Sequence, residues 1–356
     1  MKKRFLGVLL SVAMVAAVLA GCGSSGAKET AAPAGSETEA ASEAASGETE
    51  AAGNTGDVIT VGFSQVGAES DWRTANSESM KSTFSTENGY NLIFDDAQQK
   101  QENQLTAIRN FIQQEVDYIV LAPVTETGWD TVLQEAKDAG IPVIIVDRMV
   151  DVSDDSLYTA WVGSNFKLEG QKAMAWLDAY LEAKGRGDEE INLVDIQGTI
   201  GASAQIGRTE GFDEAVEAHD NWTTLAQQSG EFTQAKGQEV MESILKQSGD
   251  DIDVVYCEND NEAFGAIDAI KAAGKTCGPE GDIIVVSFDS VKAAFESMIA
   301  GDLNATFECN PLHGPRVAEI IQKLEKGEEV EKIQDVDEAY FDTSMDLEEI
   351  LKTRAY

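Results

Sequence analysis

Short aliphatic segments alternate with longer amphipathic segments over most of the chain, and this alternation restricts the folds that the sequence can adopt. Aliphatic segments in the first part are Ile59–Phe63, Asn91–Phe94, Tyr118–Leu121 and Val143–Val146. They are apolar along nearly their whole length, as strands covered on both faces of a parallel sheet must be. Strands that alternate with helices build a parallel sheet flanked by helices, so the sequence predicts an α/β fold.

The segments between these strands have the apolar spacing of helices. Apolar residues three and four positions apart predict helices over Glu78–Glu87, Gln101–Gln114 and Gly128–Ala139. The pattern restarts after Tyr158–Val162, and predicted helices and strands then alternate again from Leu168 to Ser287. The repetition predicts two similar Rossmann-like lobes.

The N-terminal residues have the layout of a secretory signal peptide. A basic start, Met1–Phe5, precedes the uncharged run Leu6–Ala20, which is too short to span a bilayer, since a spanning helix needs about 20 apolar residues. The run closes in Leu-Ala-Gly-Cys, which resembles a bacterial lipobox, where the thiol of Cys22 takes a diacylglycerol. We therefore expect a signal peptide over 1–21 and an extracytoplasmic protein anchored to the cell membrane by lipid. The alternative is a soluble secreted protein with an incidental cysteine.

The next segment and the overall charge restrict the partners of the protein. Residues 22–57 consist mostly of Ala, Ser, Thr, Gly and Glu, which cannot bury enough apolar surface to order themselves, and we expect a disordered tether. The chain has a formal net charge of -38 and no basic stripe, so it would repel phosphates, which excludes a nucleic-acid partner. Strong acidity keeps an exposed protein soluble, and we expect a monomer.

Polar and aromatic residues stand where the predicted strands end. Ligands of parallel α/β sheets bind beyond the carboxyl ends of the strands, because loops and helix N-termini converge there. Ionised Asp and Arg side chains can bind adjacent sugar hydroxyls, and aromatic rings can cover the apolar face of a sugar. The candidate ligand-binding residues are Glu69, Ser70, Asp71, Trp72, Arg73, Asp147, Arg148, Arg208, Phe232, Asn259 and Asp289.

Each of these residues also has a purely structural interpretation. Asp289 could cap the following helix. Arg148 and Arg208 could form surface ion pairs that contribute little. Trp72 could belong to the core. These alternatives remain open at the level of the sequence.

The cysteine and histidine residues have no catalytic or metal-binding spacing. The cysteines other than Cys22 are Cys257, Cys277 and Cys309. They either stay free and buried as small apolar residues, or two of them pair in an oxidising compartment. The sequence contains no oxygen-rich run with the spacing of a calcium loop. We expect no metal and no cofactor.

A resemblance to a known family is carried by six short segments, which are Val61–Gln65, Glu69–Arg73, Gln98–Asn103, Ala122–Val124, Asp147–Arg148 and Ser229–Lys236. Through them the chain resembles the periplasmic sugar-binding proteins of the ribose and galactose type, and among them the galactofuranose-binding protein of an ABC importer. The resemblance extends from Val58 to about Leu324 and implies a type I periplasmic-binding-protein fold, in which a three-strand hinge joins two lobes. The expected N-terminal lobe comprises 58–163 plus 310–336, and the C-terminal lobe comprises 164–309 plus 337–356.

The resemblance also implies roles for the site residues. Trp72 would stack on the sugar, Phe232 would close the opposite face, and the turn from Glu69 to Arg73 would wrap one edge. The residues that the resemblance implies for binding hydroxyls are Arg73, Asp147, Arg148, Arg208, Asn259 and Asp289.

The function implied by the resemblance is solute capture. The protein would bind a monosaccharide, with a galactofuranose-like hexose favoured, and deliver it to the permease and ATPase of an ABC importer. A receptor that passes a sugar signal to a membrane sensor is the alternative, because one fold can serve both functions. We do not expect an enzyme. Asp147 and Asp289 could be the paired carboxylates of a glycosidase, but neighbouring groups are expected to hold both ionised, which leaves no acid.

Overall fold

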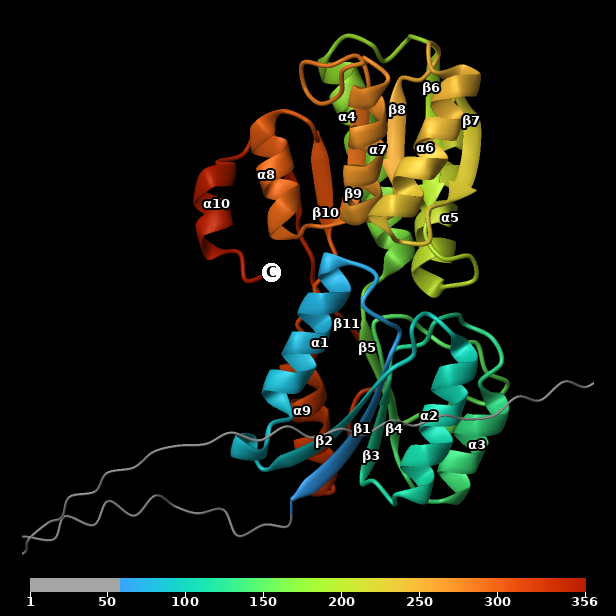
Figure 1. Cartoon of the computed structure of the whole chain (residues 1–356), viewed down its shortest axis with the longest axis vertical. Coiled ribbons are helices and arrows are strands. Elements are labelled where there is room, and N and C mark those ends of the chain that lie inside the picture. The colour runs from blue at the N-terminus through green and yellow to red at the C-terminus, as the bar shows by residue number, and fades with distance from the viewer. Residues whose placement is uncertain (1–57) are drawn as a thin grey trace, which may run out of the picture. The chain divides into compact units, whose positions relative to one another are not determined.

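The computed structural model of the protein describes residues 58–356. The predicted signal peptide, the lipid anchor at Cys22 and the tether lie outside the described residues. In the described part, helices and strands alternate and form two six-stranded sheets flanked by helices (Figure 1). The predicted α/β fold class is therefore confirmed.

The first sheet is built mainly from the N-terminal part of the described chain. Its strands are β1 (Ile59–Gln65), β2 (Tyr90–Asp96), β3 (Tyr118–Leu121), β4 (Val143–Val146), β5 (Ala160–Gly163) and β11 (Ile333–Asp335). They pair in the order β2-β1-β3-β4-β5-β11, and every pair is parallel. Its flanking helices are α1 (Asp71–Thr83), α2 (Gln101–Gln113), α3 (Asp130–Asp138) and α9 (His313–Glu325).

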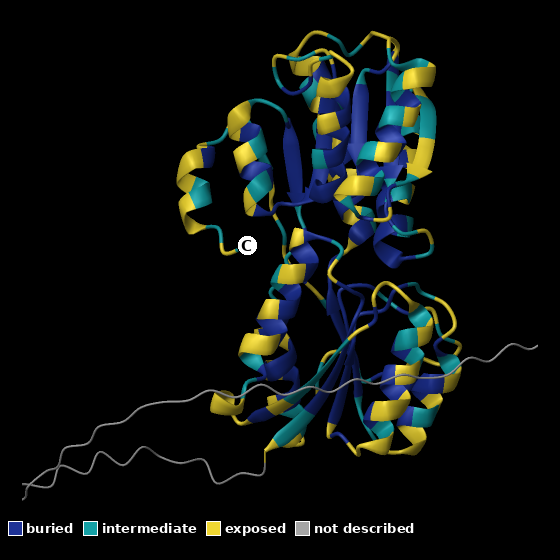
Figure 2. Ribbon diagram, in the orientation of Figure 1, coloured by how far each residue is buried: buried dark blue, intermediate teal, exposed yellow. Residues whose placement is uncertain are grey.

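Both faces of this sheet are covered, as the continuous apolar strands require. Val120 of β3 packs in a cluster with residues of α1 and α9, whereas its neighbours Ile119 and Leu121 pack with α2 and α3. Successive side chains of a strand point to opposite faces, so a strand buried on both sides must be apolar throughout. Figure 2 shows these strands buried and the outer faces of the helices exposed.

The second sheet repeats the first. Its strands are β6 (Ile191–Gln197), β7 (Trp222–Ser229), β8 (Val254–Cys257), β9 (Ile284–Asp289), β10 (Ala305–Glu308) and β12 (Tyr340–Asp342). The order is β7-β6-β8-β9-β10-β12, and β12 runs antiparallel to β10. Its helices are α4 (Phe166–Ala183), α5 (Ser203–Ala218), α6 (Gln234–Ser248), α7 (Asp260–Ala272), α8 (Lys292–Ala300) and α10 (Leu347–Thr353). The matching strand orders confirm two similar Rossmann-like halves.

Three segments of the described chain run between the two sheets. They are residues 164–165 between β5 and α4, residues 309–312 between β10 and α9, and residues 336–339 between β11 and β12. These three connecting segments correspond to the hinge that the sequence predicts. The lobe boundaries given above remain a prediction.

One helix differs from its prediction. The sequence predicts a helix over Glu78–Glu87, but α1 covers Asp71–Thr83 and is followed by a short 3-10 turn at Thr86–Asn88. The helix begins earlier because Ser70 caps it, its hydroxyl accepting a hydrogen bond from the Arg73 N–H group. This shift places the first turn of α1 at the ends of the strands.

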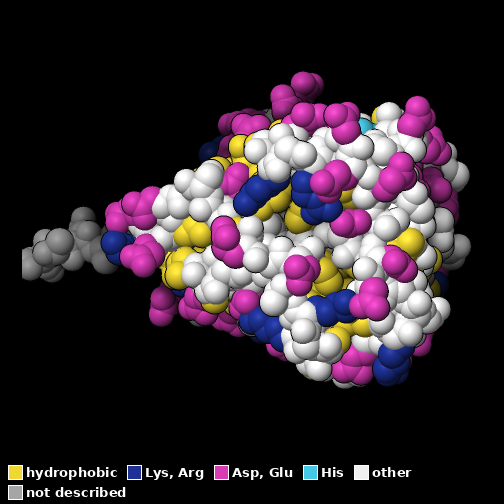
Figure 3. Space-filling view, turned by 90° about the horizontal axis from the view of Figure 1, so that it is seen from above, with side chains coloured by type: hydrophobic (Ala, Val, Ile, Leu, Met, Phe, Trp, Pro, Cys, Tyr) yellow, Lys and Arg dark blue, Asp and Glu magenta, His cyan; other side chains and the backbone are white. Residues whose placement is uncertain are grey.

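Other properties of the described residues bear on the alternatives left open by the sequence. None of the helices in residues 58–356 combines the length and the apolarity that crossing a membrane requires. Cys257, Cys277 and Cys309 are all buried, and within this part of the chain none of them forms a disulfide. The face in Figure 3 carries acidic side chains spread widely over it, with basic side chains in a few places.

Candidate ligand-binding site

A cavity lies among the loops that follow the strands of the two sheets. It encloses about 280 Å³ of space, part of which is open to solvent, and loops of both sheets line it. The structure brings together at this cavity ten of the eleven predicted site residues: Glu69, Ser70, Trp72, Arg73, Asp147, Arg148, Arg208, Phe232, Asn259 and Asp289. Their roles in binding remain a prediction.

The N-terminus of α1 positions the first group of side chains. The Ser70 cap brings Trp72 and Arg73 into the first turn of the helix, beside the cavity. Arg73 is only 2% exposed, and its Nε donates a hydrogen bond to Glu69 Oε1 at 2.9 Å. Its Nη1 lies 2.8 Å from Asp147 Oδ2. Two carboxylates therefore fix this guanidinium in place.

Arg148 is held by weaker contacts than Arg73. Its Nη1 donates to the Val124 carbonyl at 2.9 Å, and its Nη2 lies 3.9 Å from Glu69 Oε1. Its Nε is buried and has no hydrogen-bond partner among the described residues. The guanidinium lies 5.0 Å from the centre of the Phe232 ring. Burial and the charge of Arg73 lower the pKa of Arg148 to about 10, so the side chain stays cationic at neutral pH.

Close packing of α4 and α5 positions the cation of the other half of the cavity. A Cβ atom on Gly207 would lie 2.7 Å from a backbone nitrogen of α4, so a larger residue would push the helices apart. The close approach brings Arg208 Nε to 2.8 Å from Glu169 Oε2. Arg208 Nη1 donates to the Glu258 carbonyl, and Nη2 lies 3.7 Å from Asp289 Oδ1. The Arg208 guanidinium therefore contacts the carboxylates of Glu169 and Asp289 and the backbone of Glu258.

The two aspartates at the cavity differ in their preference for a proton. Burial acts to raise the pKa of Asp147, but the charges of Arg73 and Arg148 outweigh burial and hold this pKa below its ordinary value. Burial also acts on Asp289, and Arg208 does not offset it, so the pKa of Asp289 is raised. The direction of the pKa shift therefore agrees with the expectation of an ionised carboxylate at Asp147 and runs against it at Asp289.

Backbone strain coincides with the same residues. The φ angle is 63° at Asp147, 59° at Phe232 and 101° at Asp289, in the left-handed region that favours glycine. Each such residue costs on the order of 1–3 kcal/mol, and strain of this kind concentrates at ligand clamps and active sites. The strained positions support a functional use of the cavity.

Two aromatic rings form walls of the cavity. Trp72 is 3% exposed, its Nε1 donates to the Cys309 carbonyl at 2.6 Å, and its ring packs edge-on against His313 at 5.9 Å between centroids. It is therefore both a core residue and a wall residue. Phe232 sits against Gly198, where an added Cβ atom would lie 1.9 Å from the ring. The loop needs glycine at this position because the ring occupies the space of a side chain.

The helix-cap interpretation applies to Asn259 but not to Asp289. Asn259 Oδ1 accepts from the Glu262 N–H group at 2.8 Å and caps α7, while Nδ2 donates to the Phe232 carbonyl at 3.1 Å. The N-cap of α8 is Val291, and no side chain of the described residues makes a cap hydrogen bond there. Capping therefore does not explain Asp289, the last residue of β9.

Asp71 is the predicted site residue that the structure does not bring to the cavity lining in the described part of the chain. It is exposed, and its N–H group donates to Asn261 Oδ1 at 3.0 Å. A second contact between loops of the two sheets is the hydrogen bond from the Glu126 N–H group to the Gly201 carbonyl at 2.9 Å. Such contacts join the two halves beside the cavity.

The sequence did not predict five residues of the site. Phe166, Ala204 and Cys309 line the cavity, and Glu169 and Glu258 hold Arg208. Cys309 directly follows β10, so the strand-end rule could have found it. Glu169 gives no comparable signal, because it lies inside the first turn of α4 and its partner is 39 positions away.

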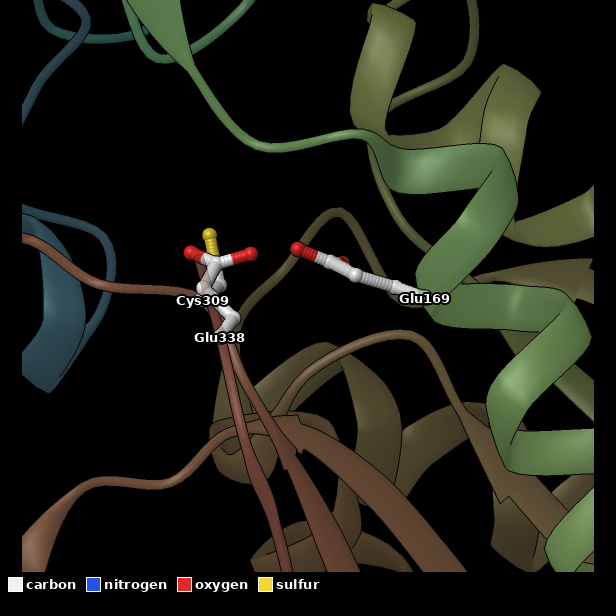
Figure 4. A group of neighbouring side chains, drawn as sticks. All are labelled: Glu169, Cys309 and Glu338. Carbon is white, nitrogen blue, oxygen red and sulfur yellow. The ribbon is translucent and has the colours of Figure 1, made fainter. Parts of the chain in front are cut away.

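A group of three side chains has the spacing of metal ligands. Potential ligand atoms of Glu169, Cys309 and Glu338 lie within 4.8 Å of one another (Figure 4). However, Glu169 is already paired with Arg208, and Glu338 Oε1 already accepts two hydrogen bonds. We therefore assign no metal ion to this group.

Comparison with known proteins assigns the chain to a family. Residues 61–329 match the periplasmic binding protein domain. The chain is 44% identical over 270 residues to the galactofuranose-binding protein YtfQ of Escherichia coli, an alignment that covers 75% of this chain and 82% of that protein. The chain belongs to the periplasmic binding protein family. Since this is a family of solute-binding proteins, the chain is a binding protein and not an enzyme.

Solved structures with the same fold are similar over most of the chain. A protein from Mycobacterium smegmatis in complex with β-D-fucofuranose is 42% identical, with a TM-score of 0.78 and coverage of 83% of this chain and 94% of that one. The binding protein of the arabinose ABC transporter from Shewanella sp. ANA-3, bound to α- and β-L-arabinofuranose, is 43% identical, with a TM-score of 0.78 and coverage of 83% and 96%. These similarities confirm the predicted resemblance and the type I fold.

Proposed function

We propose that the chain is an extracytoplasmic lipoprotein that binds a monosaccharide and delivers it to an ABC importer. A galactofuranose-like hexose is the favoured ligand, because the relatives bind galactofuranose, fucofuranose and arabinofuranose. The lobes 58–163 plus 310–336 and 164–309 plus 337–356 would close on the sugar by bending at the three connecting segments.

The observation that carries this proposal is the unused hydrogen-bonding capacity at the cavity. Arg148 Nε and Glu69 Oε2 are buried without a hydrogen-bond partner among the described residues. An unsatisfied buried group costs about 1–3 kcal/mol. Sugar hydroxyls both donate and accept, so they suit a donor and an acceptor placed at one cavity. The rings of Trp72 and Phe232 supply apolar walls for the faces of the sugar.

A binding screen tests the ligand. The chain is titrated by calorimetry with D-galactofuranose, L-arabinose, D-ribose and D-glucose, and its melting temperature is measured with each sugar. A ligand at about 100 times its Kd stabilises the folded state by about 2.7 kcal/mol. We expect a furanose-forming sugar to give the largest increase in melting temperature. The absence of binding by every monosaccharide would contradict the proposal.

An uptake experiment tests the partner. The Shewanella protein is the binding component of an ABC transporter, which supports an importer as the partner of this chain. We expect cells that lack the chain to lose uptake of the radiolabelled sugar that binds best. Normal uptake combined with loss of sugar-dependent transcription would instead support a receptor for a membrane sensor.

The lipid anchor has its own test. Cys22 is the only cysteine near the predicted cleavage site. We therefore expect Cys22→Ala to remove labelling by a radioactive fatty acid and to leave the protein unprocessed or released from the membrane fraction. A Cys22→Ala protein that still carried lipid would contradict the anchor.

A further inference from the structure

The three connecting segments meet at one carboxyl group. Glu338 lies in the segment between β11 and β12 and is partly buried. Its Oε1 accepts a hydrogen bond from Ser164 Oγ at 2.7 Å, in the first connecting segment. The same oxygen accepts from the Asn310 N–H group at 2.6 Å, in the second. Glu338 therefore holds all three connecting segments together.

This carboxyl group also faces a second one. Figure 4 shows the Glu169 side chain extending from α4 with its carboxyl group directed toward Glu338 and Cys309. Glu169 Oε2 is bound to Arg208, which lines the ligand cavity. Glu169 Oε1 is buried and has no hydrogen-bond partner among the described residues. A buried acceptor in this position needs a donor. The Cys309 thiol is a weak donor and contacts Ser164 Oγ at 3.3 Å, while the proton of that hydroxyl goes to Glu338.

The surroundings of the pair contain too little positive charge for two carboxylates. Arg208 of α5 serves Glu169 and also lies near Asp289. The exposed Lys172 of α4 is 3.4 Å from the backbone carbonyl of Glu338, not from its side chain. Within residues 58–356, no Lys or Arg nitrogen lies within the 4.0 Å of an ion pair from the Glu338 carboxyl group. Two carboxylates that share one site cannot both ionise freely.

We infer that Glu338 carries a proton and donates it in a hydrogen bond to Glu169 Oε1. Glu338 Oε1 then keeps its two donors, and both oxygens of Glu169 have partners. Burial, together with the charge of Glu169, raises the pKa of Glu338 to about 9, in agreement with a protonated group at neutral pH. Glu338 is a positioning residue, because it acts on the ligand cavity through Glu169 and Arg208.

The pH dependence of stability tests the proton. The fold favours the protonated form of Glu338, so the contribution of this group to stability is present at low pH and is lost as the pH rises through about 9. From about pH 6 to about pH 8, this group should increase the unfolding equilibrium constant by up to about tenfold per pH unit. Glu338→Gln removes this dependence, because its amide imitates the protonated acid without titrating.

The measurement is urea denaturation of the chain without sugar at a series of pH values, with unfolding monitored by tryptophan fluorescence. The matched control is Asp337→Asn, which removes an exposed carboxylate from the same segment and should keep the wild-type profile. Parallel profiles for wild type and Glu338→Gln would overturn the inference. A rise in melting temperature on adding Zn²⁺ to wild type but not to Glu338→Gln would also overturn it, since the group would then bind a metal.

Ligand affinity tests the link to the cavity, and this part rests on the proposed function. Glu338→Ala leaves Glu169 Oε1 without a donor and loosens Arg208, so the affinity for D-galactofuranose should fall about tenfold. Glu338→Gln should restore the affinity to within about twofold of wild type. Equal affinity of Glu338→Ala and wild type would overturn the link. If wild type binds no sugar, the proposed function fails, but the pH profiles still test whether Glu338 is protonated. The pH profiles also test this if Glu338→Ala does not fold.

Discussion

The two halves of the cavity use charged residues in different proportions. In the half that belongs to the first sheet, Arg73 and Arg148 face two acidic residues, Glu69 and Asp147. In the other half, one cation, Arg208, contacts both Glu169 and Asp289. Opposite charges in equal number keep both partners ionised, whereas an excess of buried acids favours protonation of some of them. The first half is therefore an arrangement of fixed charges, and the second half can titrate.

Buried acids that surround the second half of the cavity without lining it also have raised pKa values. Burial raises the pKa of Glu258, whose carbonyl oxygen accepts from Arg208, to about 8. Burial likewise raises the pKa of Asp195 and of Glu262. Protonation near neutral pH should therefore affect the second sheet more than the first.

The largest expected effect is the loss of Arg208, the only cation that lines the second half of the cavity among residues 58–356. Arg208→Met leaves Glu169 and Asp289 buried without a counter-charge, and removing one partner of a buried ion pair costs about 3–5 kcal/mol. Urea denaturation should show a loss of this size in the free energy of unfolding. Arg109→Met is the matched control, because Arg109 forms an exposed ion pair with Glu135, and exposed ion pairs contribute little to stability. Equal losses of unfolding free energy in both variants would show that the buried cation contributes no more to stability than an exposed one.

The next effect concerns the aromatic wall beside the first half. Trp72→Ala removes a buried ring that packs against His313 and donates to the Cys309 carbonyl. The free energy of unfolding should fall by about 3 kcal/mol, as for other large-to-small changes in a core. Sugar affinity should fall as well, because the ring also lines the cavity. Wild-type stability of this variant would show that Trp72 has no role in the core.

Arg148 should affect binding more than stability. Its Nε is free among the described residues, and the nearest carboxylate oxygen of an ion pair is 3.9 Å away. Removing a charge-assisted hydrogen bond to a sugar hydroxyl costs about 1.5–3 kcal/mol, so Arg148→Ala should weaken binding at least about tenfold. Calorimetric titration gives the affinity, and denaturation without sugar should show a change below about 1 kcal/mol. Lost stability with unchanged affinity would exclude Arg148 from the binding site.

The two aspartates should differ in how much stability is lost at neutral pH when each is neutralised. Asp147→Asn removes a carboxylate that offsets Arg73, and it should lower the free energy of unfolding at neutral pH by about 1.5 kcal/mol. Asp289→Asn imitates the protonated form that burial favours, and it should cost less than about 0.5 kcal/mol.

The pH dependence of stability in the same two variants shows in which direction each carboxyl group changes stability as the pH rises. The contribution of Asp147 is present above its ordinary pKa and is lost as the pH falls through its lowered value. The contribution of Asp289 is present at low pH and is lost as the pH rises through its raised value. Denaturation of both variants across the pH range measures these slopes. Identical profiles for the two variants would show that the halves do not differ in charge balance.

The smallest effect is expected at Asp71. Its side chain is exposed and its contact with Asn261 Nδ2 is long, at 3.5 Å. Asp71→Ala should change the free energy of unfolding by less than about 0.5 kcal/mol and the sugar affinity by less than about threefold. A tenfold loss of affinity would place Asp71 in the binding site after all, as the sequence predicts.

Strand-end residues and buried networks differed in how well the sequence predicted them. Asp147 and Asp289 were predictable because parallel strands place their carboxyl ends at one edge of each sheet. The start of α1 was not predictable, because the cap at Ser70 outweighs the apolar spacing that predicts a helix over Glu78–Glu87. Glu169 was not predictable either, because its role depends on how closely α4 packs on α5.

The hydrogen bond from the Glu126 N–H group to the Gly201 carbonyl joins the two halves through backbone atoms alone. Replacing the side chain of Glu126 by any residue other than proline leaves both atoms in place. Gly201 has less freedom, because its φ angle is 85°. In evolutionary terms, the neighbouring loops can acquire new side chains for a different solute while this link between the halves persists. Divergence of the loop side chains and retention of this backbone link are therefore separable in this part of the molecule.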